Sequence, residues 1–166
     1  MVGERLVASG LLARAASPFV DAAVGALQNS LELVADAEEQ LRALLGYPLA
    51  ETLASEAAAP FVEDGFGEVA AAVLAAHESG ELAAAVAGGA DGFKKWINGV
   101  GKAQGRKGKR LFMPVRIALT GRMQGPDVGA LLRMLATEEG DVAEAGAYVS
   151  LPQRMEALRA HAAPPQ

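Results

Sequence analysis

Two glycine-rich stretches come closest to a nucleotide-binding pattern, and neither satisfies it. The spacing of Gly99, Gly101 and Gly105 approaches that of a dinucleotide-binding loop, but the last interval is one residue too long and no strand is expected before it. A phosphate loop ending at Gly108-Lys109 needs a glycine five residues before that pair, where the sequence has Ala103. The glycine patterns therefore predict no nucleotide site.

Side chains that could perform acid–base or metal chemistry are few. The chain has no cysteine and only two histidines, His77 and His161, which leaves neither a thiolate nor enough imidazoles for a zinc site or a catalytic triad. Neighbouring carboxylates on a helix point in different directions and do not converge on one substrate. The adjacent acidic pairs are Glu38-Glu39, Glu63-Asp64 and Glu138-Glu139. We expect no catalytic residue and no metal ligand in this chain.

The distribution of charge is more informative than its total. The net charge is −5, but residues 94–133 carry +9 between segments of −11 (1–93) and −3 (134–166). A dense positive block attracts a polyanion, and its neighbours Phe93, Trp96 and Phe112 could stack on bases. The alternatives are a solvated basic face, or a complement to the acidic half, with the rings in the core. The basic residues are Lys94, Lys95, Lys102, Arg106, Lys107, Lys109, Arg110, Arg116, Arg122 and Arg133.

Composition predicts an all-α protein. Of 166 residues, 51% are hydrophobic and only 5% aromatic, with long Ala-rich stretches that favour helix over sheet. Gly88-Gly89 coincides with the change of charge sign, so we expect two small helical subdomains, 1–89 and 90–166. No apolar run approaches the roughly 18 residues that span a bilayer, which argues against a membrane protein.

Periodicity and helix-capping residues predict the helices one by one. Leu6, Val7, Leu11 and Leu12 suggest a first helix, although Arg5 and Arg14 among small residues also fit an organellar presequence. Further helices are expected at 18–27 and 31–45, at 49–59 before Pro60, at 65–78, and at 81–86. Beyond these, Asp91 would cap a helix through Val100, a loop would cover 105–108, and Pro114 and Pro126 would each begin a helix. The last helix is expected over 150–160.

One long string has a specific likeness. Lys107-Gly-Lys-Arg-Leu-Phe-Met-Pro-Val-Arg-Ile-Ala-Leu-Thr-Gly121 resembles the C-terminal anticodon-binding region of bacterial-type glutamyl-tRNA synthetases, most of all the cyanobacterial and plastid branch. Weaker similarity, including Leu45-Gly-Tyr-Pro-Leu49 and Glu63-Asp-Gly-Phe66, extends over roughly residues 18 to 160. The resemblance implies a helix cage of two subdomains, and a location in the plastid stroma or otherwise the cytoplasm.

The resemblance does not include the catalytic part of that family. Neither the His-Ile-Gly-His-like signature nor the Lys-Met-Ser-Lys-Ser-like loop occurs in the sequence. We therefore expect no cofactor in this chain, since ATP and Mg²⁺ would be bound by a catalytic domain that it lacks. The chain would be a fragment, a separately encoded half, or a relative recruited for another task.

The resemblance also implies roles for individual residues. Arg116 would read an anticodon base with its forked guanidinium, and the alternative is that it caps local carbonyls or pairs with Asp127. The turn after the motif would line the anticodon with Gln124, Gly125, Pro126 and Val128. Basic side chains would contact tRNA phosphates without reading sequence. They are Lys94, Lys95, Lys102, Arg106, Lys107, Lys109, Arg110 and Arg122.

Two functions remain open at this point. The first is recognition of the anticodon loop of tRNA-Glu, together with a catalytic synthetase part encoded upstream or separately. The second is a non-catalytic scaffold or assembly subunit that docks on RNA or protein through its basic face. The presence of both Arg116 and the Gly125-Pro126 turn favours the first, because a scaffold does not need a base-reading pair.

Overall fold

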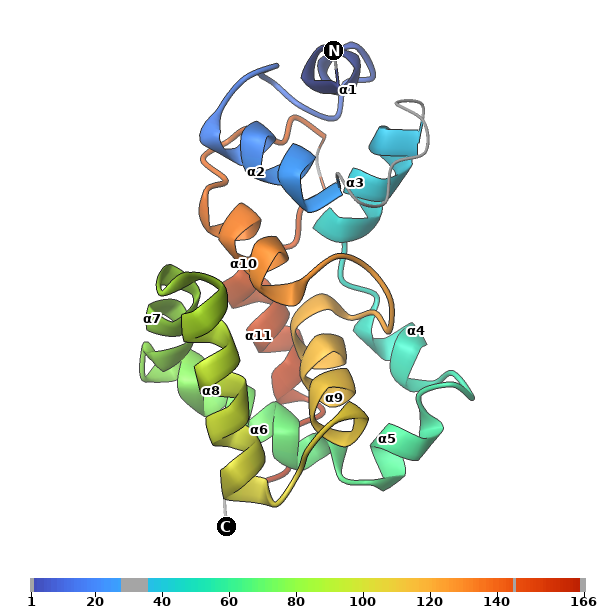
Figure 1. Ribbon diagram of the computed structural model, residues 1–166. Coiled ribbons are helices and arrows are strands. Elements are labelled where there is room, and N and C mark those ends of the chain that lie inside the picture. The colour runs from blue at the N-terminus through green and yellow to red at the C-terminus, as the bar shows by residue number, and fades with distance from the viewer. Residues whose placement is uncertain (1, 28–35, 145, 165–166) are drawn as a thin grey trace. The chain divides into compact units, whose positions relative to one another are not determined.

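The computed structural model describes residues 2–27, 36–144 and 146–164, and its regular secondary structure there is helical (Figure 1). The only extended pairing in this part of the chain is an isolated bridge between Leu12 and Val142. The all-α prediction is confirmed. Contacts divide the chain into two compact units, unit 1 with Met1–Tyr47 and Gly125–Leu151, and unit 2 with Pro48–Gln124 and Pro152–Gln166.

Unit 1 holds α1 (Val2–Ala8), α2 (Pro18–Leu27), α3 (Ala37–Leu45) and α10 (Val128–Ala136). The start of α2 is as predicted, with Pro18 in its first position and the Val20 N–H donating to Ser17 Oγ at 3.1 Å. The buried face of α2 packs against α10. The Asp127 carboxylate caps α10 by accepting from the Ala130 N–H at 2.8 Å.

Unit 2 contains the basic block as far as Arg122, whereas Arg133 lies in unit 1. Its helices are α4 (Leu49–Leu53), α5 (Ala59–Glu63), α6 (Phe66–Glu78), α7 (Glu81–Ala87), α8 (Gly89–Gln104), α9 (Lys109–Thr120) and, from Pro152 onward, α11 (Leu151–Arg159). In this unit α6 packs against α7 and α9, and α7 packs against α8. The fully buried Arg154 donates from Nη1 to the Leu119 carbonyl at 3.2 Å, which ties α11 to the end of α9.

The change of charge sign does not coincide with a boundary between these units. The subdomains expected from the charge pattern, 1–89 and 90–166, would separate α7 from α8 at Gly88-Gly89, but both helices lie in unit 2 and pack together. The units are instead discontinuous, since each is built from two segments of the chain. Local composition does not report such long-range pairing.

Two prolines have positions different from those predicted. Pro60 does not close a helix over 49–59, because α4 ends at Leu53 and Pro60 lies in the first turn of α5, where its missing N–H costs nothing. Pro114 does not begin a helix either. It lies inside α9, which starts at Lys109 and buries Leu111, Val115 and Leu119, so packing of this face outweighs the proline penalty.

Other helix ends differ by shorter distances. The first helix ends at Ala8, so the buried Leu11 and Leu12 lie beyond it. Asp91 lies in the first turn of α8 and does not cap it, and Pro126 precedes α10 by two residues. The predicted helix over 31–45 is seen as α3 from Ala37, and its residues up to 35 lie outside the described part. The helices at 18–27 and 81–86 and the loop at 105–108 are confirmed.

No described helix is both long and apolar enough to cross a bilayer alone. Only α6 and α7 taken together meet that criterion, and they are bent by 80° at the break between them.

The close approach of α8 and α9 gives a test of this packing. A methyl group on Gly101 would lie 2.6 Å from Leu111 Cδ2 and 2.7 Å from the Arg106 carbonyl oxygen, whereas one on Gly99 would meet nothing within 4 Å. We expect G101A to lower the free energy of unfolding by about 1–3 kcal/mol, as overpacking does. On the same helix, G99A should raise it by up to about 1 kcal/mol through helix propensity. Urea unfolding followed by circular dichroism measures both, and equal stability of the two variants would contradict the packing.

Candidate nucleic-acid interface

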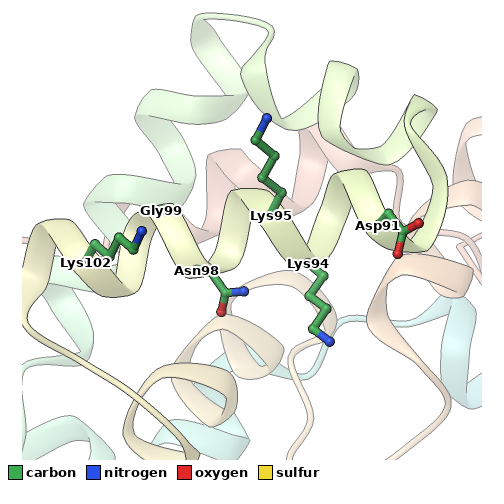
Figure 2. A pocket seen from close by; sticks show the side chains of 6 residues that line it. All are labelled: Asp91, Lys94, Lys95, Asn98, Gly99 and Lys102. Atoms are coloured by element: carbon green, nitrogen blue, oxygen red, sulfur yellow. The ribbon is translucent and has the colours of Figure 1, made fainter.

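Helix α8 separates its aromatic side chains from its lysines. Phe93 and Trp96 are each 6% exposed and their ring centroids lie 5.6 Å apart, so these two rings belong to the core. Lys94 and Lys95 are exposed and leave the helix in opposite directions in Figure 2. They border a shallow hollow whose other lining residues are Asp91, Asn98, Gly99 and Lys102.

Arg106, in contrast, is directed into the protein. Its side chain is 6% exposed and donates from Nη1 to Asp64 Oδ2 at 2.8 Å and from Nη2 to Glu68 Oε2 at 3.2 Å. Nη2 also contacts the backbone carbonyls of Asp64 and Gly65. A side chain at Gly65, which has φ +93°, would collide with Nη2. Arg106 therefore joins the α8–α9 turn (residues 105–108) to the α5–α6 turn, and is not the exposed phosphate ligand that the sequence predicts.

Arg110 is held by the same carboxylate. Its Nε and Nη2 donate to Asp64 Oδ2 at 3.0 Å and Oδ1 at 2.6 Å, a bidentate pair on an exposed side chain. These hydrogen bonds, and then the positive charges of Arg110 and Arg106, lower the pKa of Asp64. Two of the predicted phosphate ligands are thus neutralised by Asp64 and Glu68.

The other predicted phosphate ligands differ in exposure. Lys94, Lys95, Lys102 and Lys107 are exposed, and none of them forms an ion pair within the described residues. Lys109 is also exposed, with Nζ 5.8 Å from the centre of the Phe61 ring. Arg122 is half-buried. Among the described residues of unit 2, the exposed lysines without an ion pair therefore lie mainly on α8 and the turn after it, with Lys109 at the start of α9.

A second hollow in unit 2, the α4–α9 hollow, collects residues that lie far apart in sequence. The Thr52 hydroxyl donates to the Gly121 carbonyl at 2.5 Å, which holds α4 against the end of α9. The hollow contains Lys109, Arg122 and Gln124, all singled out from the sequence. Sequence analysis gave no role to the other lining residues, although Pro48 and Met113 lie in strings that carry the resemblance: Pro48, Glu51, Thr52, Ser55, Ala57, Met113 and Met123.

The predicted base-reading residues are divided between the units. Arg116, half-buried on α9, and the exposed Gln124 belong to unit 2. Gly125, Pro126 and Val128 belong to unit 1, where Gly125 has φ +141°, a conformation that favours glycine. Val128 is only 8% exposed, so its side chain is part of the core and not of an open surface.

These features define a class of protein, a helical module with a lysine-rich surface beside a shallow hollow. No group of three or more acidic or histidine side chains in the described part of the chain could hold a metal ion. The family model described as "Anticodon binding domain" matches residues 7–140, and the chain belongs to that family. The likeness to the anticodon-binding region of glutamyl-tRNA synthetases is thereby confirmed.

Individual relatives agree with this assignment. The chain is 34% identical over 134 residues to glutamate–tRNA ligase 2 of Methylobacterium sp., which is 81% of this chain and 25% of that protein. It is 47% identical over 49 residues to glutamate–tRNA ligase 1 of Rickettsia typhi, 30% of this chain and 11% of that protein. It is also 53% identical over 45 residues to glutamate–tRNA ligase of Natranaerobius thermophilus, 27% of this chain and 9% of that protein. The chain thus spans a quarter or less of these relatives. No solved structure matches it significantly.

The pairing of Asp64 predicts a pH dependence. Folding lowers the pKa of Asp64. Its ion pairs therefore stabilise the fold fully when the pH is above the ordinary pKa near 3.8, and this stabilisation is lost as the pH falls through the lowered pKa. We expect D64N to lower the free energy of unfolding at pH 7. The difference in free energy of unfolding between D64N and the parent protein should become smaller below about pH 4.

The neighbouring Glu63 provides the control, since it is exposed and pairs with neither arginine. E63Q should leave the free energy of unfolding at pH 7 unchanged. A D64N protein as stable as E63Q at neutral pH, measured by urea unfolding, would show that the Arg106–Asp64–Arg110 contacts stabilise nothing.

Proposed function

We propose that this chain is the module that recognises the anticodon loop of tRNA-Glu in a glutamate–tRNA ligase. The observation that carries the proposal is the exposed lysines on α8 and the α8–α9 turn, which form no ion pair within the described residues, in a member of the anticodon binding domain family. The choice of glutamate rests on its relatives, which are named glutamate–tRNA ligases. ATP and Mg²⁺ would be bound by a catalytic part outside these 166 residues.

Phosphate binding is the first component of the proposed recognition. Lys94, Lys95, Lys102 and Lys107 offer ammonium groups to the RNA backbone, which position a loop without distinguishing its sequence. Arg106 and Arg110 have a structural role. They hold the α8–α9 turn to the α5–α6 turn, so that the lysines lie on a fixed surface.

Base reading is the second component. The bases of a single-stranded loop can be splayed out and recognised through hydrogen bonds at their edges. The guanidinium of Arg116 and the amide of Gln124 are suited to the acceptors and donors of those edges. Gln124 shares the α4–α9 hollow with Met113 and Met123, whose flexible thioethers can adapt to a flat base. In unit 1 the side chain of Val128 is buried, so the turn would offer the backbone of Gly125-Pro126 to the RNA.

Substitutions can distinguish residues that contact phosphates from residues that recognise bases. We expect Q124A and R116A to weaken binding of an anticodon stem-loop with the glutamate anticodon by about 1–3 kcal/mol, and to affect loops with other anticodons much less. R116K should resemble R116A, because lysine keeps the charge and loses the fork. K107A should weaken all loops alike and reduce the slope of log affinity against log salt by about 0.7.

Fluorescence anisotropy with labelled stem-loops measures these affinities, and circular dichroism first confirms that each variant is folded. Gln124 is exposed, so Q124A tests base reading even if the half-buried Arg116 proves structural. A uniform loss across anticodons for Q124A and R116A would contradict base recognition. Salt-independent binding would instead support the scaffold function.

A further inference from the structure

Phe112 has an unusual position for a large apolar side chain. Among the described residues only Phe112 and Val62 are large hydrophobic residues that are exposed, at 45% and 44%. On α9 its neighbours Leu111 and Val115 are buried, so the inner face of the helix is already filled without it. The ring is therefore not needed to complete the core of unit 2. It presents a flat apolar surface on the outside.

The surroundings of the ring are cationic. Phe112 lines a hollow between the end of α8, the α8–α9 turn and the start of α9, together with Asn98, Lys102 and Lys107. Both lysines are exposed and neither forms an ion pair within the described residues. The remaining lining residues are Gly101, Gly105, Arg106, Gly108 and Leu111, so no carboxylate borders the hollow.

The ring also lies close to a residue to which the proposed function gives a role. Arg116 follows Phe112 by four residues on α9, which places both on the same face of the helix, about one turn apart. A nucleotide bound at the hollow would thus be a neighbour of the base that Arg116 reads. The Phe112 ring would therefore contact the nucleotide next to the one at Arg116 in a bound strand.

We propose that Phe112 is a stacking platform for one unpaired RNA base, with Lys102 and Lys107 holding the phosphates on either side of it. The proposal rests on the proposed function for the source of the RNA, the loop of a tRNA. A purely anionic partner such as an acidic peptide would need only the lysines, whereas an exposed ring that shares its hollow with two exposed lysines fits a base flanked by two phosphates. Every base has a π-face, so this contact is tolerant of sequence.

The test uses two probes, a ten-residue oligouridylate and an abasic ribose-phosphate oligomer of the same length. We expect F112A to weaken binding of the oligouridylate by about fivefold or more, the lower end of what one stacked base contributes. The slope of log affinity against log salt should not change, because no phosphate contact is lost. Binding of the abasic oligomer should not change either. K107A should weaken both probes and reduce the slope.

Three further variants sharpen the result. F112W should restore or strengthen binding of the oligouridylate, and its exposed indole should be quenched by a stacked base, whereas the parent protein has only the buried Trp96. F112L keeps apolar bulk without an aromatic face and should resemble F112A. V62A removes the other exposed apolar side chain and should bind like the parent protein. Circular dichroism establishes that each variant is folded.

The outcomes against the proposal are distinct. If F112A loses the same affinity for both probes, the ring only supports the lysines. If F112L binds the oligouridylate as well as the parent protein does, stacking is absent. Undiminished binding by F112A, together with displacement of the abasic oligomer by a polyglutamate peptide, would favour an acidic protein partner. Oligouridylate carries no glutamate anticodon, so failure here leaves the Q124A and R116A comparison intact, and failure of that comparison leaves this one intact.

Discussion

The arrangement of unit 2 depends on the contact of Arg106 with Asp64, Gly65 and Glu68. An almost fully buried guanidinium that loses its carboxylates would remain as an uncompensated charge, so this contact strongly favours one path for the chain between α8 and α9. The path sets where α9 begins, at Gly108-Lys109, and therefore which of its side chains face outward. Through this constraint an acidic turn in the N-terminal half determines the presentation of the basic C-terminal block.

The distribution of charged side chains in unit 2 explains how a chain of net charge −5 can present a surface for a polyanion. Part of the positive block is neutralised internally by Asp64 and Glu68, at the base of the α8–α9 turn. The exposed lysines of α8 and that turn lie outside this cluster. Since charges in water are screened beyond about 8–10 Å, a bound phosphate responds to these lysines far more than to the total charge. Local arrangement, and not the sum, determines what this surface attracts.

Much of the fold could be predicted from local patterns, and the rest depends on contacts between distant segments. The all-α class, the start of α2 at Ser17-Pro18 and the loop at 105–108 follow from composition and capping chemistry. Two prolines show where local patterns fail. The local sequence does not determine whether Pro60 and Pro114 end a helix, begin one or lie inside it, because packing or helix register decides their positions. For the candidate site, the sequence identified the basic block and the motif and set Arg116 apart, but it treated the predicted phosphate ligands as equivalent. Only the structure distinguishes the buried Arg106 from the exposed Lys107, one residue away, or the core ring of Trp96 from the exposed ring of Phe112.

We expect RNA to bind to the exposed lysines of α8 and the α8–α9 turn in unit 2. Nuclear magnetic resonance of the ¹⁵N-labelled chain, titrated with an anticodon stem-loop that carries the glutamate anticodon, tests it most directly. We expect amide shifts to concentrate between residues 94 and 124, with the Arg106 side-chain signals unchanged. A stem-loop from which the loop bases have been removed should shift fewer of these amides. Shifts confined to the acidic N-terminal residues, or spread evenly over the chain, would contradict it.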